Sequence, residues 1–187
     1  MQPDDRSERF CALHAAAAPR LWSWAALHVG PALRGKVDPE DLLQEVAARA
    51  WRRFDEFDPA RGSFFGWSLG IARRVLAEAL ARLAAGGFEG RRAPAAGGSD
   101  AWSEVPDDAT RATARLARED ALQAFLAWAE TLERDERRLL LYRGLEGASH
   151  AEVAALLGLS EAAVSKRWDR LRERLRAHPR VLALLDG

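Results

Sequence analysis

A concentration of cations near the end of the chain offers the clearest chemistry in this sequence. From Ala162 to Arg180 there are seven Lys or Arg residues against two Asp or Glu residues. Apolar residues recur there at steps of four, three and four, which places them on one face of a helix and the charges on the other. The apolar residues are Val164, Trp168, Leu171 and Leu175; the free face carries Ala162, Lys166, Asp169, Arg170 and Glu173, flanked by Ser165, Arg172, Arg167 and Arg174. Such a local excess of positive charge suits a phosphate backbone.

A short helix before this one is needed to hold it in place. We expect that helix at residues 150–157, where Val153, Ala154, Leu156 and Leu157 give it an apolar side. Gly158 supplies a positive φ at its end, and Ser160 can cap the cationic helix that follows. The arrangement is that of a helix-turn-helix. A plain pair of helices with a solvated basic face fits the same pattern.

A second cluster of residues combines aromatic rings with arginines. Five rings fall within fourteen residues beside three cations: Phe54, Phe57, Phe64, Phe65 and Trp67, with Arg61, Arg73 and Arg74. Rings with basic neighbours can stack and hold single-stranded bases. The same rings could instead close a small helical core. Phe64, Phe65 and Trp67 cannot all point inward from one helical turn, so we expect at least one at the surface.

Two helices are predicted ahead of the aromatic cluster. The first runs from Glu8 to about Gly30, with a kink or boundary at Pro19. The second begins at Asp38, which can act as N-cap, and has Pro39 in its first turn. Its buried stripe is Leu43, Val46, Ala47, Ala50, Trp51 and Phe54, and this leaves Asp41, Gln44, Glu45 and Ala48 as an outward acidic patch. A third helix, capped by Ser63, is expected from Phe64 to about Ala85.

The composition changes after the third helix. Residues 86–113 are rich in Gly, Ala, Pro, Ser and Asp with almost no apolar period, which predicts a flexible linker. Trp102 within it is interpreted as a stray aromatic. The chain is therefore expected to be all-α, with two small helical domains at 1–85 and 114–187, the second one a helix-turn-helix. Further helices are predicted at 114–130 and 136–143, and a short apolar tail after Pro179 is expected to fold back on its own domain.

The overall composition excludes several classes of protein. The 187 residues carry 28 basic and 28 acidic side chains, which argues for local rather than general contact with polyanions. Cys11 is the only cysteine, so no disulfide can form within the chain, and Cys11 with His14 is half a metal site at most. We expect no metal, no cofactor and no catalytic residues. The charged N-terminus and the absence of a long apolar run predict a cytoplasmic protein.

Two stretches of the chain resemble conserved regions of one protein family. DPEDLLQEVAARAWRRFDEFDPARGSFFGWSLGIARR, from Asp38 to Arg74, is similar to the second region of bacterial sigma factors. LERDERRLLLYRGLEGASHAEVAALLGLSEAAVSKRWDRLRERLR, from Leu132 to Arg176, is similar to their fourth region. The order of the two and the linker between them resemble the extracytoplasmic-function (group IV) type of the sigma-70 family. The chain departs from the family at Arg74, usually Asn, and at Glu78, usually Asp.

The resemblance implies a subunit that binds core RNA polymerase, directs it to specific promoters and helps to melt the −10 element. The residues implied in core binding are Asp41, Leu42, Gln44 and Glu45. Those implied at the −10 element are Arg61, Ser63, Phe64, Trp67, Arg73 and Arg74, and those implied at the −35 element are Ser165, Lys166, Arg167, Asp169, Arg170 and Arg174. Among the last group, Arg167 and Arg174 would contact phosphates.

Other functions fit parts of the sequence. A stand-alone helix-turn-helix regulator would bind duplex DNA without polymerase, and a helical interaction module would not need the cations of residues 162–174 at all. The sigma-factor interpretation predicts core polymerase and promoter DNA as partners, with an anti-sigma factor as a further candidate. It also predicts a monomer when free and no contact with a membrane.

Overall fold

Helices are the one kind of regular secondary structure in the part of the chain that the structure describes. The computed structural model describes residues 3–33, 35–86, 105–109 and 120–178, and no strand occurs in these ranges. This confirms the predicted all-α fold. By its internal contacts the chain divides into two units, Met1–Arg118 and Glu119–Gly187. None of the helices in these ranges combines the length and apolar composition that a bilayer crossing requires.

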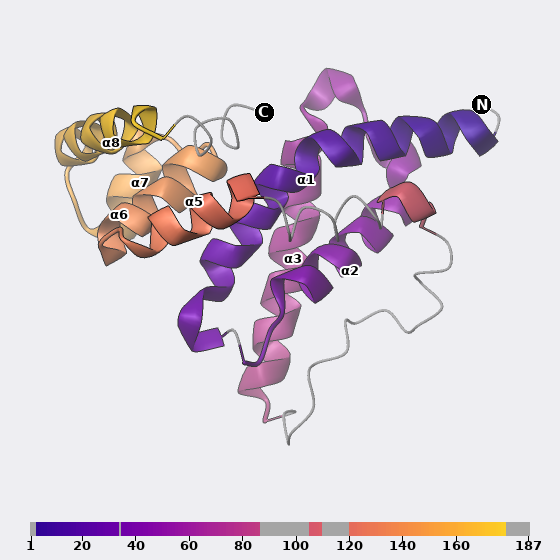
Figure 1. Ribbon diagram of the computed structural model, residues 1–187, viewed down its shortest axis with the longest axis horizontal. Coiled ribbons are helices and arrows are strands. Elements are labelled where there is room, and N and C mark those ends of the chain that lie inside the picture. The colour runs from indigo at the N-terminus through magenta and orange to yellow at the C-terminus, as the bar shows by residue number, and fades with distance from the viewer. Residues whose placement is uncertain (1–2, 34, 87–104, 110–119, 179–187) are drawn as a thin grey trace. The chain divides into compact units, whose positions relative to one another are not determined.

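Three long helices form most of the described part of the first unit, and they pack against one another in pairs (Figure 1). They are α1 (Pro3–Leu33), α2 (Pro39–Arg52) and α3 (Phe64–Ala84). Large apolar side chains of all three fill the space between them, among them Phe10, Leu21, Trp24, Val46, Leu69 and Val75, each 4% exposed or less. Burial of this apolar surface is the main term that holds the unit together.

Helix α1 is longer than predicted at its N-terminal end. It starts at Pro3 rather than Glu8. A kink or a boundary was expected at Pro19, and there is no boundary, because the helix runs through this residue. Its axis changes direction along its length (Figure 1), as a proline inside a helix favours. The break predicted at Gly30 is confirmed, because this residue has a non-helical backbone with φ 43° and ψ 173°.

Capping residues set the starts of α2 and α3 as predicted. The Asp38 carboxylate accepts a hydrogen bond from the Glu40 backbone N–H at 2.8 Å, and Ser63 Oγ accepts from Gly66 N–H at 3.1 Å. Between these helices the chain forms two 3-10 turns, η1 (Phe54–Glu56) and η2 (Pro59–Arg61). Gly62 then takes φ 152°, a conformation that L side chains rarely adopt.

Part of the predicted linker is packed against the first unit. Val105 is 4% exposed and Ala109 is fully buried. Burial raises the pKa of the Cys11 thiol on α1, and the nearby Asp108 carboxylate raises it further. The prediction of a flexible linker at 86–113 did not include this packing at 105–109, where the two apolar side chains are buried. Trp102, residues 114–119 and the tail from Pro179 lie outside the described residues.

Within residues 120–178, the second unit has four α-helices and a π-helical turn. They are α5 (Asp120–Glu130), α6 (Arg134–Leu139), η4 (Leu140–Leu145, the π turn), α7 (His150–Leu157) and α8 (Glu161–Arg176). Helix α6 begins two residues earlier than predicted because Glu133 and Glu136 form a capping box. The π turn was not predicted. A Cβ atom on Gly144 within it would lie 3.2 Å from the Trp168 ring, so glycine lets that ring pack closely.

The turn between α7 and α8 has the predicted geometry. Gly158 is left-handed with φ 67° and ψ 35°, and Ser160 Oγ accepts from Ala163 N–H at 3.2 Å. Val164, Leu171 and Leu175 are each 1% exposed or less, and Trp168 is half-buried, which confirms the inward face of α8. Leu156, in contrast, is 51% exposed, so the apolar side of α7 is narrower than predicted.

Candidate nucleic-acid interface

Helix α8 presents the polar face that its sequence predicts. Ala162, Lys166, Asp169, Arg170 and Glu173 are all exposed, and Ser165 is half-buried on the flank. Within the described part of the chain, Lys166, Asp169 and Arg170 have no ion-pair partner. Two cations and one carboxylate are thus available on one helix face. This set can donate to guanine O6 and N7 and accept from a cytosine amino group.

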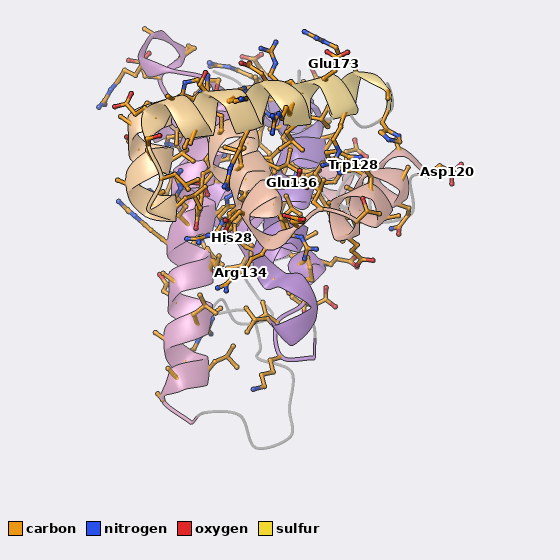
Figure 2. The ribbon with its side chains drawn as sticks, turned by 90° about the vertical axis from the view of Figure 1, so that its left-hand side faces the viewer. His28, Asp120, Trp128, Arg134, Glu136 and Glu173 are labelled. Carbon is orange, nitrogen blue, oxygen red and sulfur yellow. The ribbon has the colours of Figure 1, made fainter. Side chains whose placement is uncertain are left out.

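The flanking arginines of α8 are engaged by carboxylates of α6. Arg174 Nη1 lies 2.5 Å from Glu136 Oε1, and Arg167 Nη1 lies 3.4 Å from Asp135 Oδ2. Figure 2 shows Glu136 on the side of α6 that faces α8, whereas Glu173 points away from the rest of the unit. Both arginine side chains are 45% exposed, so each pair stabilises the unit by about 1 kcal/mol or less. Such weak pairs can exchange a carboxylate for a phosphate.

The loop between α2 and α3 surrounds a cavity of about 530 Å³. Its lining residues are Arg53, Glu56, Phe57, Asp58, Arg61, Gly62, Ser63, Gly66 and Trp67. The rings of Phe57 and Trp67 lie 5.5 Å apart between centroids. The structure thus places Arg61, Ser63 and Trp67 together, as the sequence predicts, and adds Glu56 and Asp58, which the sequence analysis did not single out.

Charged groups in this cavity can read the edge of a base. The Arg53 guanidinium donates three hydrogen bonds to Glu56, the shortest 2.6 Å long, and this contact holds the pKa of the Glu56 carboxyl below its usual range. The Asp58 carboxylate accepts from Ala60 N–H at 2.9 Å. Ionised carboxylates accept from exocyclic amino groups, arginine donates to ring nitrogens and carbonyls, and flat rings stack on base faces.

Phe64 is a core residue rather than a surface ring. It is 5% exposed, and its ring packs edge-on against Phe10 and Phe57 at centroid distances of 5.8 and 5.4 Å. Phe65 is half-buried beneath the Arg20 guanidinium, 4.0 Å from the ring centroid. Trp67 is the member of the three that lines the cavity, which agrees with the prediction of a ring at the surface. Arg73 and Arg74 are exposed further along α3.

The outward acidic patch predicted on α2 was wrong. Glu45 and Ala48 are 1% and 0% exposed, and Leu42 is 4% exposed. The reason is that α2 packs against both α1 and α3, so more than one stripe of it is covered. Asp41 and Gln44 are half-buried.

A network of charges that was not predicted ties α2 to α3. Arg49 Nε donates to Glu45 Oε1 at 2.7 Å, and its two terminal nitrogens donate to Glu78 at 2.8 and 2.7 Å. These bonds lower the pKa of the Glu78 carboxyl. The four-residue spacing of Glu45 and Arg49 was the one sequence signal available for it.

Comparisons with known proteins agree on one family. Sigma-70 region 2 matches residues 13–85, and Sigma-70, region 4 matches residues 122–175. The chain is 34% identical over 138 residues to a probable RNA polymerase sigma factor, RfaY, of Xanthomonas campestris pv. campestris. That match covers 73% of this chain and 33% of the relative, so the chain spans about a third of its length.

Two further relatives are matched over most of their length. The ECF RNA polymerase sigma factor EcfG of Rhodopseudomonas palustris is 27% identical over 172 residues, which are 92% of this chain and 83% of the relative. The RNA polymerase sigma factor CnrH of Cupriavidus metallidurans is 27% identical over 195 residues, 95% and 96% of the two chains. No solved structure matches the chain significantly.

Proposed function

The chain belongs to the sigma-70 family of RNA polymerase sigma factors, in its extracytoplasmic-function branch, and from this premise we propose how its two helical units share promoter recognition. It is a transcription initiation factor that directs RNA polymerase to promoters, and it is not an enzyme. The observation that carries this function is the presence of both sigma regions in order on one chain. A stand-alone helix-turn-helix regulator is not favoured, since it has no use for region 2.

The second unit reads the −35 element in this proposal. Lys166, Asp169 and Arg170 meet base edges because they are exposed and without ion-pair partners in the described ranges, and Ser165 borders them. A bidentate contact from Arg170 to guanine contributes about 1–3 kcal/mol of discrimination. Arg167 and Arg174 exchange their carboxylate partners for phosphates, which position the helix without reading sequence.

The first unit melts the −10 element in this proposal. The cavity of Arg61, Ser63 and Trp67 takes an unstacked base of the separated strand, and Arg73 and Arg74 contact its phosphates. Flipping a base out of the stack costs a few kcal/mol, which stacking on aromatic side chains offsets. Phe64 supports the cavity from within the core. The departure from the family at Arg74 adds a cation where the usual residue is a neutral amide.

Core polymerase is the third partner in this proposal. Asp41 and Gln44 are partly exposed on α2 and make the contact, while Leu42 and Glu45 fix the shape of that helix from beneath. We further propose a region 2 domain at 1–85, a linker at 86–113 and a region 4 domain at 114–187. The free protein is expected to be a monomer, and an anti-sigma factor is a candidate inhibitor.

Run-off transcription on genomic fragments tests the proposed function. Core RNA polymerase of the source bacterium is mixed with the chain, and transcript starts are mapped; we expect discrete promoters that core enzyme alone does not use. Lys166→Ala and Arg170→Ala should lose these transcripts. Arg176→Ala is the matched control, because Arg176 lies in the last turn of α8 and is not among the residues proposed to contact DNA. A chain that does not associate with core polymerase in gel filtration would contradict the proposal.

A further inference from the structure

Residues 105–109 are the one part of the predicted linker beyond Gly86 that the structure describes (Figure 1). They end in a helical turn, which Ala109 N–H closes by donating to the Pro106 carbonyl at 3.0 Å, and they belong to the first unit. We propose that the face of α1 around Cys11 is a docking surface for this segment, and that release of the segment increases the distance that the two units can span. This inference rests on the proposed function of the two units.

The segment has an apolar side and a charged side. Val105 and Ala109 are four residues apart, the spacing that puts two side chains on one side of a helical turn. They are 4% and 0% exposed, whereas Asp107 and Asp108 are exposed. Two small apolar side chains make a weak contact compared with a helix–helix interface, so the segment can leave α1 without unfolding of the unit.

The surface that receives the segment lies on α1. The Cys11 thiol forms hydrogen bonds with the Ala109 backbone and with the Ser7 side chain, and Ser7 lies one helical turn before Cys11 on the same face. Burial raises the pKa of the thiol and the Asp108 carboxylate raises it further, while the two hydrogen bonds lower it. The reactivity of the thiol therefore reports whether the segment is docked.

Docking shortens the stretch of chain that joins the two units. With the segment docked, the ten residues 110–119 separate it from α5, and ten residues span at most about 36 Å. With the segment released, the stretch is residues 87–119, which span at most about 120 Å. The −10 and −35 elements are about 25 base pairs apart by their names, which is about 85 Å of B-DNA. The docked tether covers less than half of that distance, and the released tether exceeds it.

The reach of the tether decides whether both units can bind one promoter together. Linking two binding modules strengthens binding only when the tether can span their sites. The docked state therefore favours a chain whose units bind DNA separately, and the released state favours simultaneous binding at both elements. The family matches cover residues 13–85 and 122–175, so they assign no role to Cys11 or to residues 105–109.

A reversible disulfide lock tests the docking. Cys11 is the only cysteine, so any disulfide within Ala109→Cys joins positions 11 and 109. We expect it to form in the free chain, because the Ala109 backbone is already hydrogen-bonded to the Cys11 thiol. The oxidised chain is purified and combined with core RNA polymerase and a promoter mapped by run-off transcription. In fluorescence anisotropy, the locked holoenzyme should bind this promoter at least roughly tenfold more weakly than the same sample after reduction with dithiothreitol.

Short DNA fragments separate reach from recognition. A premelted fragment with the −10 element alone and a duplex with the −35 element alone each engage one unit, so the locked and reduced chains should bind each of them equally. The control variant exchanges the two residues, Cys11→Ala with Ala109→Cys. It has the same composition as the wild-type chain but cannot form the bridge, so oxidation and reduction should leave its promoter binding unchanged.

A carboxylate on the apolar side of the segment should release it. Val105→Asp should make Cys11 of the free chain react several-fold faster with a maleimide at neutral pH, because a thiol that is no longer buried carries more thiolate. Ala16→Asp, at an exposed position of α1, is the matched control and should not change the rate. Equal thermal melting of the two variants should show that the fold of the first unit is retained.

The possible outcomes separate this device from the proposed function. Failure of the disulfide to form, or equal thiol reactivity in Val105→Asp and the wild-type chain, would overturn the docking. A locked chain that binds the full promoter as tightly as the reduced chain would overturn the effect on reach. Both results leave sigma activity in place. Failure of the wild-type chain to bind core polymerase or the promoter would overturn the proposed function, and the disulfide and the thiol reactivity of the free chain would still decide the docking.

Discussion

Replacing Arg49 by methionine should destabilise the first unit severely. The change removes the guanidinium that donates to Glu45 at 2.7 Å and leaves a carboxylate that is 1% exposed without a counter-charge. Its other oxygen, Oε2, is already buried without a hydrogen-bond partner. Breaking a buried pair by removing one partner costs about 3–5 kcal/mol. Glu78 is 48% exposed, so its lost bonds add about 1 kcal/mol at most.

The expected loss is therefore about 4 kcal/mol, which lowers the melting temperature of a unit of this size by about 15 °C or more. Urea and thermal unfolding of the full chain, followed by tryptophan fluorescence, measure it. The control is Glu45→Met with Arg49→Met, which removes both charges and should recover most of the loss. Glu78→Gln alone should cost about 1 kcal/mol or less. The reasoning is refuted if the double variant is as unstable as Arg49→Met alone.

Three further predictions concern pH, the helix-turn-helix and the pairs on α8. Burial lowers the pKa of His14 to about 4, below its unfolded value of 6.5. The contribution of the neutral His14 ring to the free energy of unfolding is therefore complete above pH 6.5 and is lost as the pH falls towards 4. This contribution amounts to about 3 kcal/mol. Urea unfolding at pH 7 and pH 4.5 should show a smaller loss of stability at the lower pH for His14→Phe than for the wild-type chain. Equal losses in the two proteins would contradict the prediction. Gly158→Ala should lower the free energy of unfolding by about 1 kcal/mol in thermal melting, because φ is 67°. The space around the Cβ is open, so the cost comes from the backbone conformation and not from a clash. No loss of stability would show that this conformation relaxes in the variant. Glu136→Gln should free Arg174, tighten non-specific duplex binding and steepen the salt dependence by about one charge; the gain should vanish in an Arg174→Gln background, and Asp120→Asn is the charge-matched control.

Local patterns in the sequence predicted the elements that depend on near neighbours. The caps at Asp38, Ser63 and Ser160 and the left-handed Gly158 involve contacts within a few residues, and the structure has them as predicted. The inward stripe of α8 is equally local, since it depends only on helical spacing. These features could therefore be predicted from the order of residues alone.

Features that depend on distant contacts could not be predicted in this way. The helical pattern placed Glu45 on the outer face of α2, but packing against two other helices buries it and Arg49 compensates its charge. The π turn at Leu140–Leu145 accommodates the Trp168 ring, which lies more than twenty residues later in the chain. The cavity of the aromatic loop is an exception, because all of its lining residues fall between Arg53 and Trp67.

The carboxylates of α6 have a consequence for the search for promoters. A chromosome offers about 10⁶–10⁹ competing non-specific sites, and a free factor with every arginine open to phosphate would be spread over them. Occupying Arg167 and Arg174 with Asp135 and Glu136 removes up to two such contacts until a duplex is presented in the correct orientation. We therefore expect the protein that is not bound to polymerase to bind bulk DNA more weakly than it would without these two pairs.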